Sequence, residues 1–151
     1  MTKRWLAGVA ITALLGCSDT SGPSPLEALY NANLQKWTQS GPTSYRMEIG
    51  RSCACPPSGT VILTVRNLVV ESRVYSDTGE PVPPAKADEF PDVPTLFAII
   101  RQALDLDYYA LSIQYDPTYG YPATVLLDRV GSTLEDNINY QILDLQPLTG
   151  P

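Results

Sequence analysis

The spacing of apolar residues along the chain predicts two amphipathic helices. The first begins after a capping Ser24 and stops before Gly41. The second opens at Asp92 or Thr95, because Pro94 is tolerated only in a first helical turn. Apolar residues at helical spacing form one stripe on each helix: Leu26, Leu29, Tyr30, Leu34 and Trp37 on the first, and Leu96, Phe97, Ile100, Ala103 and Leu104 on the second.

Alternation of apolar and polar residues, the pattern of half-buried strands, recurs along the rest of the chain. The proline-rich, acidic segment 77–91 is expected to be a loop, residues 116–122 a hairpin loop, and Asn67 a turn residue with positive φ. The order helix, three strands, helix, three strands predicts an α+β fold, in which two helices cover one face of an antiparallel sheet of about six strands. The strands are expected near residues 45–49, 61–65, 69–75, 111–115, 123–127 and 138–142.

The N-terminal segment resembles a targeting signal. An apolar run over residues 6–15 follows two cationic residues and is shorter than the roughly 20 residues that span a bilayer. It ends in Leu14-Leu15-Gly16-Cys17, which resembles the lipobox of bacterial lipoproteins, whose cysteine is acylated after cleavage. We therefore expect a signal peptide over residues 1–16 and a lipid (palmitate) anchor on Cys17. The alternative is an ordinary secreted protein with a cysteine at that point.

The residues after the lipobox predict how the protein is attached. Residues 17–24 are small and polar after the cysteine, as in a flexible tether, and residues 25–151 are expected to form a single α+β domain. Ser18, rather than an aspartate, follows Cys17, which by resemblance to the sorting rule of enteric bacteria favours the outer membrane. The expected location is the bacterial cell envelope, with the membrane as a partner through Cys17.

Composition then narrows the function. The chain has 151 residues, a formal net charge of -6 and no histidine. Without histidine, this chain alone can form neither an imidazole-based catalytic site nor a histidine-bearing zinc site. Its excess of acidic residues argues against a nucleic-acid partner. We find no catalytic motif and expect no enzyme, no cofactor and no metal. A non-catalytic binding or assembly module for an unknown envelope protein or ligand is the expected function.

The most specific candidate site in the sequence is a pair of cysteines besides Cys17. Cys53 and Cys55 would lie about 6.6 Å apart (Cα to Cα) on a straight strand, near the upper limit of about 6.8 Å for a disulfide, so a bridge forms more easily where the backbone bends. The pair is expected to be a local structural staple. The alternative function is an envelope thiol-disulfide or soft-metal handling protein that acts through Cys53 and Cys55.

A second candidate site is a contact loop formed by Asp116, Tyr119 and Tyr121. Tyrosines on a proline-flanked loop bring contact area at a low cost in entropy. In the structural alternative, Asp116 caps its own turn, Tyr121 covers the hairpin and Tyr115 packs in the core, which is the interpretation we prefer for Tyr115. The acidic residues of the chain follow no calcium-loop spacing.

Short motifs distributed over residues 26–145 carry a family resemblance. They are Trp37, Ser44-Tyr45-Arg46, Cys53-Ala54-Cys55, Thr78-Gly79-Glu80-Pro81, Leu96-Phe97, Tyr115-Asp116-Pro117, Gly120-Tyr121-Pro122 and Asp128. In order and spacing they resemble a bacterial lipoprotein family known as domain of unknown function 6174. The chain departs from it at Asn67-Leu68, where the family tends to have a glycine-containing turn, and at Asn137, where it tends to have a glutamate. The resemblance implies fold and location, but no activity.

Overall fold

The computed structural model describes residues 22–55, 59–131 and 137–149. The signal peptide expected over residues 1–16, the lipidated Cys17 and the tether as far as residue 21 lie outside the described residues. The last tether residues, 22–24, are exposed and have no regular secondary structure. Within the described part, no helix is long and apolar enough to cross a membrane.

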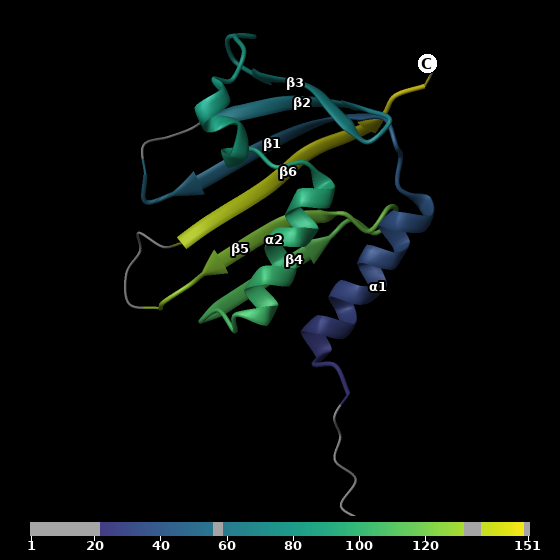
Figure 1. The fold of residues 1–151 in the computed structure, drawn as a ribbon, viewed down its shortest axis with the longest axis vertical. Coiled ribbons are helices and arrows are strands. Elements are labelled where there is room, and N and C mark those ends of the chain that lie inside the picture. The colour runs from purple at the N-terminus through teal and green to yellow at the C-terminus, as the bar shows by residue number, and fades with distance from the viewer. Residues whose placement is uncertain (1–21, 56–58, 132–136, 150–151) are drawn as a thin grey trace, which may run out of the picture.

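Six antiparallel strands form one open sheet in the order β3-β2-β1-β6-β5-β4 (Figure 1). Each helix is followed by a three-stranded meander, and the two meanders join where β1 pairs with β6 from Tyr45↔Pro147 to Cys53↔Ile138. This arrangement confirms the predicted α+β fold and its element order. The strands are β1 (Tyr45–Cys53), β2 (Thr60–Arg66), β3 (Val69–Tyr75), β4 (Ala110–Tyr115), β5 (Pro122–Asp128) and β6 (Asn137–Pro147).

Two helices, α1 (Pro25–Ser40) and α2 (Val93–Asp105), lie on the same face of the sheet (Figure 1). Both begin at predicted caps: the side chain of Ser24 accepts a hydrogen bond from the backbone N–H of Glu27 at 3.1 Å, and Asp92 accepts one from Thr95 at 3.0 Å. The second helix therefore opens at Asp92. Alternate strand residues point toward the helices and are buried with them: Tyr45, Met47, Ile49, Val61, Leu63, Val65, Val125, Leu127, Tyr140 and Ile142.

The helices use their apolar stripes differently. On α2, Leu96, Phe97, Ile100 and Ala103 are all buried, as predicted. On α1, only Tyr30 and Trp37 are buried, whereas Leu29 is 47% exposed. The aromatic residues of α1 attach it to the core. Tyr30 meets Phe97 edge-on, with 5.8 Å between ring centroids, and Trp37 meets Tyr45 edge-on at 5.7 Å.

The segment expected to be a loop over residues 77–91 is more ordered than the sequence suggested, and that prediction was wrong. It contains a short 3-10 helix, η1 (Pro84–Glu89), and a β-bridge between Val74 and Pro81. Val82 and Phe90 are buried, and the backbone oxygen of Phe90 accepts a hydrogen bond from Arg73 Nε at 3.0 Å. The segment therefore closes one end of the core, because Val82, Phe90 and Pro91 are buried while Pro81, Pro83 and Pro84 are exposed.

The opposite face of the sheet carries no helix among the described residues. Antiparallel sheets tolerate such a face when its side chains are polar. Here the strand register places charged residues such as Arg46 and Glu48 on it, together with uncharged polar residues, among them Ser52, Thr60, Thr64, Ser72, Thr124, Asn139 and Gln141.

Candidate functional site

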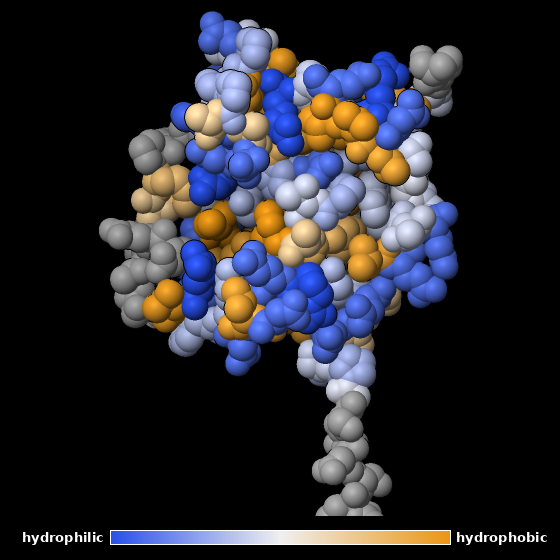
Figure 2. Space-filling view, in the orientation of Figure 1, coloured by the Kyte–Doolittle hydropathy of each residue, from blue (hydrophilic) through white to orange (hydrophobic). Residues whose placement is uncertain are grey.

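A groove opens between the C-terminal half of α1, the start of α2 and the β2–β3 turn. Its volume is about 310 Å³, at the lower end of the range of small-ligand sites. Figure 2 shows apolar residues exposed on the helix-bearing face of the molecule at this end of the sheet. The apolar side chains that line the groove are Leu34, Trp37, Pro42, Leu68, Pro94 and Phe97.

Leu68 stands at the rim of this groove in an unusual backbone conformation. Asn67 and Leu68 have φ values of 48° and 68°, so the prediction for Asn67 is confirmed and its neighbour adopts the left-handed region too. The turn is held there because the backbone N–H of Asn67 donates to Ser44 Oγ at 3.0 Å and that of Leu68 donates to the Thr43 oxygen at 2.8 Å. A left-handed conformation costs an L-residue other than glycine about 1–2 kcal/mol. The result is an apolar side chain that is 61% exposed.

Trp37 forms the back of the groove and is fixed from several sides. Its ring meets Tyr45 edge-on at 5.7 Å and Tyr121 at 6.2 Å. Tyr45 is buried, its hydroxyl accepts a hydrogen bond from the Val93 N–H at 3.3 Å, and burial raises the pKa of this phenol. A Cβ at Gly41 would lie 2.6 Å from the Trp37 ring, so the chain turns away from α1 at a residue without a side chain. The groove wall is therefore rigid.

The predicted contact loop packs against α1. Asp116 Oδ1 accepts hydrogen bonds from the backbone N–H of Thr118 at 3.0 Å and of Tyr119 at 2.6 Å, which confirms its turn-capping role. Gly120 has φ +79°, and a Cβ there would lie 2.8 Å from a backbone oxygen of α1. Tyr119 and Tyr121 are partly buried against the core. The loop thus braces α1, and Tyr121 supports the groove from behind.

Tyr115, expected in the core, is partly buried there and stacks on Phe97 with 6.2 Å between ring centroids and 19° between ring planes. Burial raises the pKa of its hydroxyl as well. Because Phe97 also lines the groove, this stack supports the groove from the side of the sheet.

The other predicted site, the cysteine pair, lies at the far end of β1 from the groove. Cys53 and Cys55 are joined in a disulfide with their Cα atoms 5.1 Å apart. This separation is shorter than the strand geometry predicts because β1 ends at Cys53 and the backbone bends over residues 54–55. Arg51 donates from Nη1 to Cys53 Sγ at 3.2 Å and to Cys55 Sγ at 3.6 Å. The same nitrogen lies 3.6 Å from the Glu89 carboxylate, and the arginine side chain is only 16% exposed.

A hollow of about 380 Å³ adjoins the cysteine pair on the polar face of the sheet, lined by Ser52, Cys53, Ala54, Leu126, Asn137 and Asn139. Among the described residues, the buried Oδ1 atoms of Asn137 and Asn139 have no hydrogen-bond partner. These atoms are acceptors, so the hollow suits a group that donates N–H or O–H.

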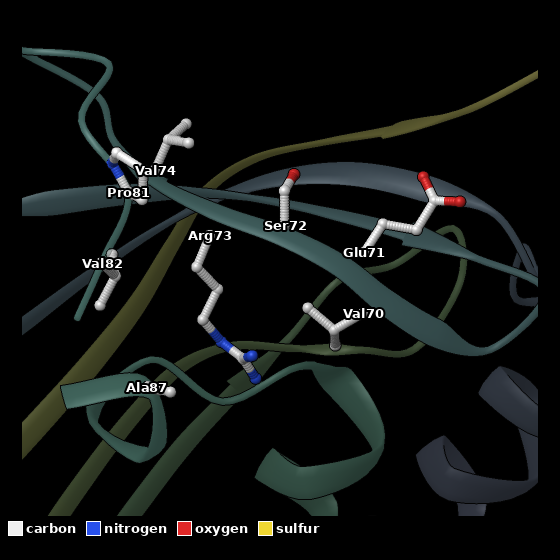
Figure 3. Close-up of a pocket in the computed structure, with 8 residues that line it drawn as sticks. All are labelled: Val70, Glu71, Ser72, Arg73, Val74, Pro81, Val82 and Ala87. Atoms are coloured by element: carbon white, nitrogen blue, oxygen red, sulfur yellow. The ribbon is translucent and has the colours of Figure 1, made fainter. Parts of the chain in front are cut away.

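A third hollow, of about 320 Å³, follows the edge strand β3 (Figure 3). Val70 and Arg73 lie on the side of β3 that faces the helices, and Ser72 and Val74 on the other. Arg73 is engaged with Phe90, and the Val82 N–H already covers the Arg73 oxygen at 2.9 Å. The side chain and the backbone oxygen of Arg73 are therefore both paired within the fold. In the described ranges, moreover, no three His, Cys, Asp or Glu side chains gather to hold a metal ion.

Sequence reasoning identified the cysteine pair and the loop but missed the groove. Its lining comes from segments that are far apart in the chain, so no single sequence motif predicts it. The one available signal was Leu68, an apolar residue in a turn that favours glycine.

Comparison with known proteins bears on family alone. A model described as a family of unknown function, DUF6174, matches residues 29–147. No curated protein and no solved structure matches the chain.

Proposed function

Since the chain belongs to the family of unknown function DUF6174, we propose a function from its own residues: it is a lipid-anchored, non-catalytic binding module of the bacterial cell envelope. Its binding site is the groove between α1, α2 and the β2–β3 turn. Its partner is an apolar segment of another envelope protein.

Leu68 is the observation that carries the binding proposal. An exposed apolar side chain on a strained turn is unfavourable for the folded chain alone, and such strain is typically retained where it serves a function. In the groove lining, Leu68 is the apolar residue that the turn contributes. A partner that covered its exposed side chain would remove this apolar surface from water and gain about 25 cal/mol per Å².

The shape of the groove favours a segment over a flat protein surface. At about 310 Å³ it has room for a few apolar side chains. Its walls are Trp37 and Phe97, each held by a second aromatic ring, so little order needs to be gained on binding. Aromatic residues in a preformed hollow are the usual anchoring points of protein interfaces.

The anchor is proposed from the sequence. The lipobox-like segment ending at Cys17 and the small polar residues after it support attachment to the outer membrane through acyl chains. Residues 22–24, exposed and without regular structure just before α1, are compatible with the end of a tether.

Photo-crosslinking in living cells tests the binding site. A photoreactive amino acid in place of Leu68 is expected to give one discrete protein adduct, because the side chain sits at the groove rim. The matched control is the same amino acid in place of Tyr109, which is 72% exposed but lies away from the groove. If both positions give the same adducts, or neither gives any, the groove is not the binding site.

Metabolic labelling with palmitate tests the anchor separately. The full chain is expected to incorporate label and to sediment with outer membranes, whereas Cys17→Ser is expected to lose the label. A labelled Cys17→Ser variant, or an unlabelled native chain, would refute the anchor without bearing on the groove.

A further inference from the structure

We propose that the Cys53–Cys55 disulfide is a redox-active electron acceptor for the dithiols of envelope proteins, and that Arg51 is the positioning residue that stabilises its leaving thiolate. This activity is separate from binding in the groove. It rests on three observations: one guanidinium contacts both sulfurs, the two cysteines differ in exposure, and the disulfide joins no second element to the fold.

A largely buried cation lies against both sulfurs. Arg51 Nη1 is 3.2 Å from Cys53 Sγ and 3.6 Å from Cys55 Sγ, and its side chain is 16% exposed. A positive charge at this distance favours a thiolate over the neutral thiol. A disulfide whose leaving sulfur is stabilised as a thiolate is reduced faster, and stabilisation of the reduced form makes it a stronger oxidant.

The position of the disulfide argues against a purely structural role. Structural disulfides stabilise a fold by closing long loops, but here only Ala54 separates the two cysteines. Cys53 is already held in the sheet, where it pairs with Ile138 of β6. The bond therefore joins no second element to the fold, and its reduction leaves the strand pairing intact.

Exposure assigns different roles to the two sulfurs. Cys55 is exposed, whereas Cys53 is partly buried and closer to the guanidinium. A thiolate of the partner protein attacks Cys55 Sγ, the disulfide bond breaks, and Cys53 leaves as the thiolate beside Arg51. The partner's second thiolate then attacks the partner sulfur of the mixed disulfide and releases Cys55. Two electrons pass from the partner dithiol to the pair and the partner becomes a disulfide. Of the two protons of its thiols, one is taken up by Cys55 and one goes to solvent, because Cys53 stays the thiolate beside Arg51.

Glu89 allows a test in which the disulfide is expected to become easier, rather than harder, to reduce. Its carboxylate lies 3.6 Å from Arg51 Nη1 and offsets part of the positive charge at the sulfurs. Removal of the Arg51 charge should make the pair harder to reduce, whereas Glu89→Gln should make it easier. A loss of local packing would instead move both variants in the same direction.

The experiment is a redox titration of the full chain, purified in a mild detergent and equilibrated in a glutathione series. Thiols are trapped with a maleimide and counted by intact mass. We expect the native pair to open within the series and Arg51→Met to need a ratio of squared glutathione concentration to glutathione disulfide concentration about tenfold higher at the midpoint, equivalent to about 30 mV. Arg51→Lys, which keeps the charge, should recover most of this difference. Arg46→Met, an exposed arginine on the other face of β1, is the matched control and should behave as the native chain.

A readout on the reduced chain does not depend on the stability of the variants. The rate of alkylation of the reduced native chain should rise at a lower pH than in Arg51→Met, because the guanidinium favours the thiolate. The proposal is overturned by a pair that stays oxidised through the whole glutathione series, by Arg51→Met and Glu89→Gln shifts of the same sign, or by reduced thiols that hold copper or zinc in equal stoichiometry.

Discussion

Leu68 offers a direct test of the strain that supports the binding site. Glycine normally makes a folded protein about 0.5–1 kcal/mol less stable than alanine, because the unfolded chain with glycine has more conformational freedom. At a φ of 68° the order should reverse. Alanine keeps the left-handed strain of about 1–2 kcal/mol, whereas glycine has none. Leu68→Gly should therefore be more stable than Leu68→Ala by about 0.5–1 kcal/mol.

The comparison with the native chain follows from exposure. Leu68 is 61% exposed, so about two fifths of its side chain is buried. Full burial of a leucine is worth about 1.5–3 kcal/mol, so either substitution loses about 1 kcal/mol of burial. In Leu68→Gly the relief of strain offsets this loss, and its stability should lie close to that of the native chain. Leu68→Ala should be the less stable variant, with a Tm lower by about 2–4 °C.

Thermal and urea unfolding of the full chain in a mild detergent measure these differences. The control is Leu106, which is 58% exposed and has an ordinary φ of -94°. There, alanine should be more stable than glycine. If alanine is the more stable substitution at both positions, the turn is not strained and the argument for the groove loses its main support.

Three further predictions concern the packing around the groove. Burial raises the pKa of Tyr45 and Tyr115 above the ordinary 10.0, so the folded state keeps protons that the unfolded state loses; stability should therefore fall as the pH rises above about 10, and less steeply in Tyr45→Phe, as measured by urea unfolding across that range. Gly41→Ala should destabilise the chain by about 1–3 kcal/mol and shift the fluorescence of the groove tryptophan, because its Cβ would meet the indole ring at 2.6 Å, whereas Gly22→Ala, with nothing within 4 Å, should change neither. Asp116→Ala should cost about 1–2 kcal/mol in thermal unfolding, since two backbone N–H groups lose their acceptor, and Asp116→Asn should recover most of it; equal losses would contradict the turn-capping role.

The parts of the fold that depend on local chemistry could be predicted from the sequence. Ser24 and Asp92 cap their helices with their own side chains, and Asn67 adopts the positive φ that its turn requires. The strands follow from alternation, since one face of each strand is buried. These signals lie within a few residues of the structure that they specify.

The rest depends on contacts between distant segments. Nothing near Val82 or Phe90 in the sequence shows that this proline-rich segment closes the core, because their contacts are with β3: the Val82 N–H donates to the Arg73 oxygen, and the Phe90 ring meets Tyr75 edge-on. The contact of Arg51 with both sulfurs needs the bend after Cys53, which strand geometry alone does not predict. The groove likewise exists only once α1 has been placed on the sheet by its aromatic rings.

The strand β1 connects the two proposed activities and also separates them. It begins at Tyr45, in contact with the tryptophan of the groove, and ends at Cys53 in the disulfide. At about 3.3 Å per residue, its ends are roughly 26 Å apart. Substitutions more than about 10 Å apart without shared partners usually have additive effects. A double variant, Leu68→Gly with Arg51→Met, should therefore show the sum of the two single changes in unfolding free energy. Either end of the strand could thus diverge in evolution without loss of the other.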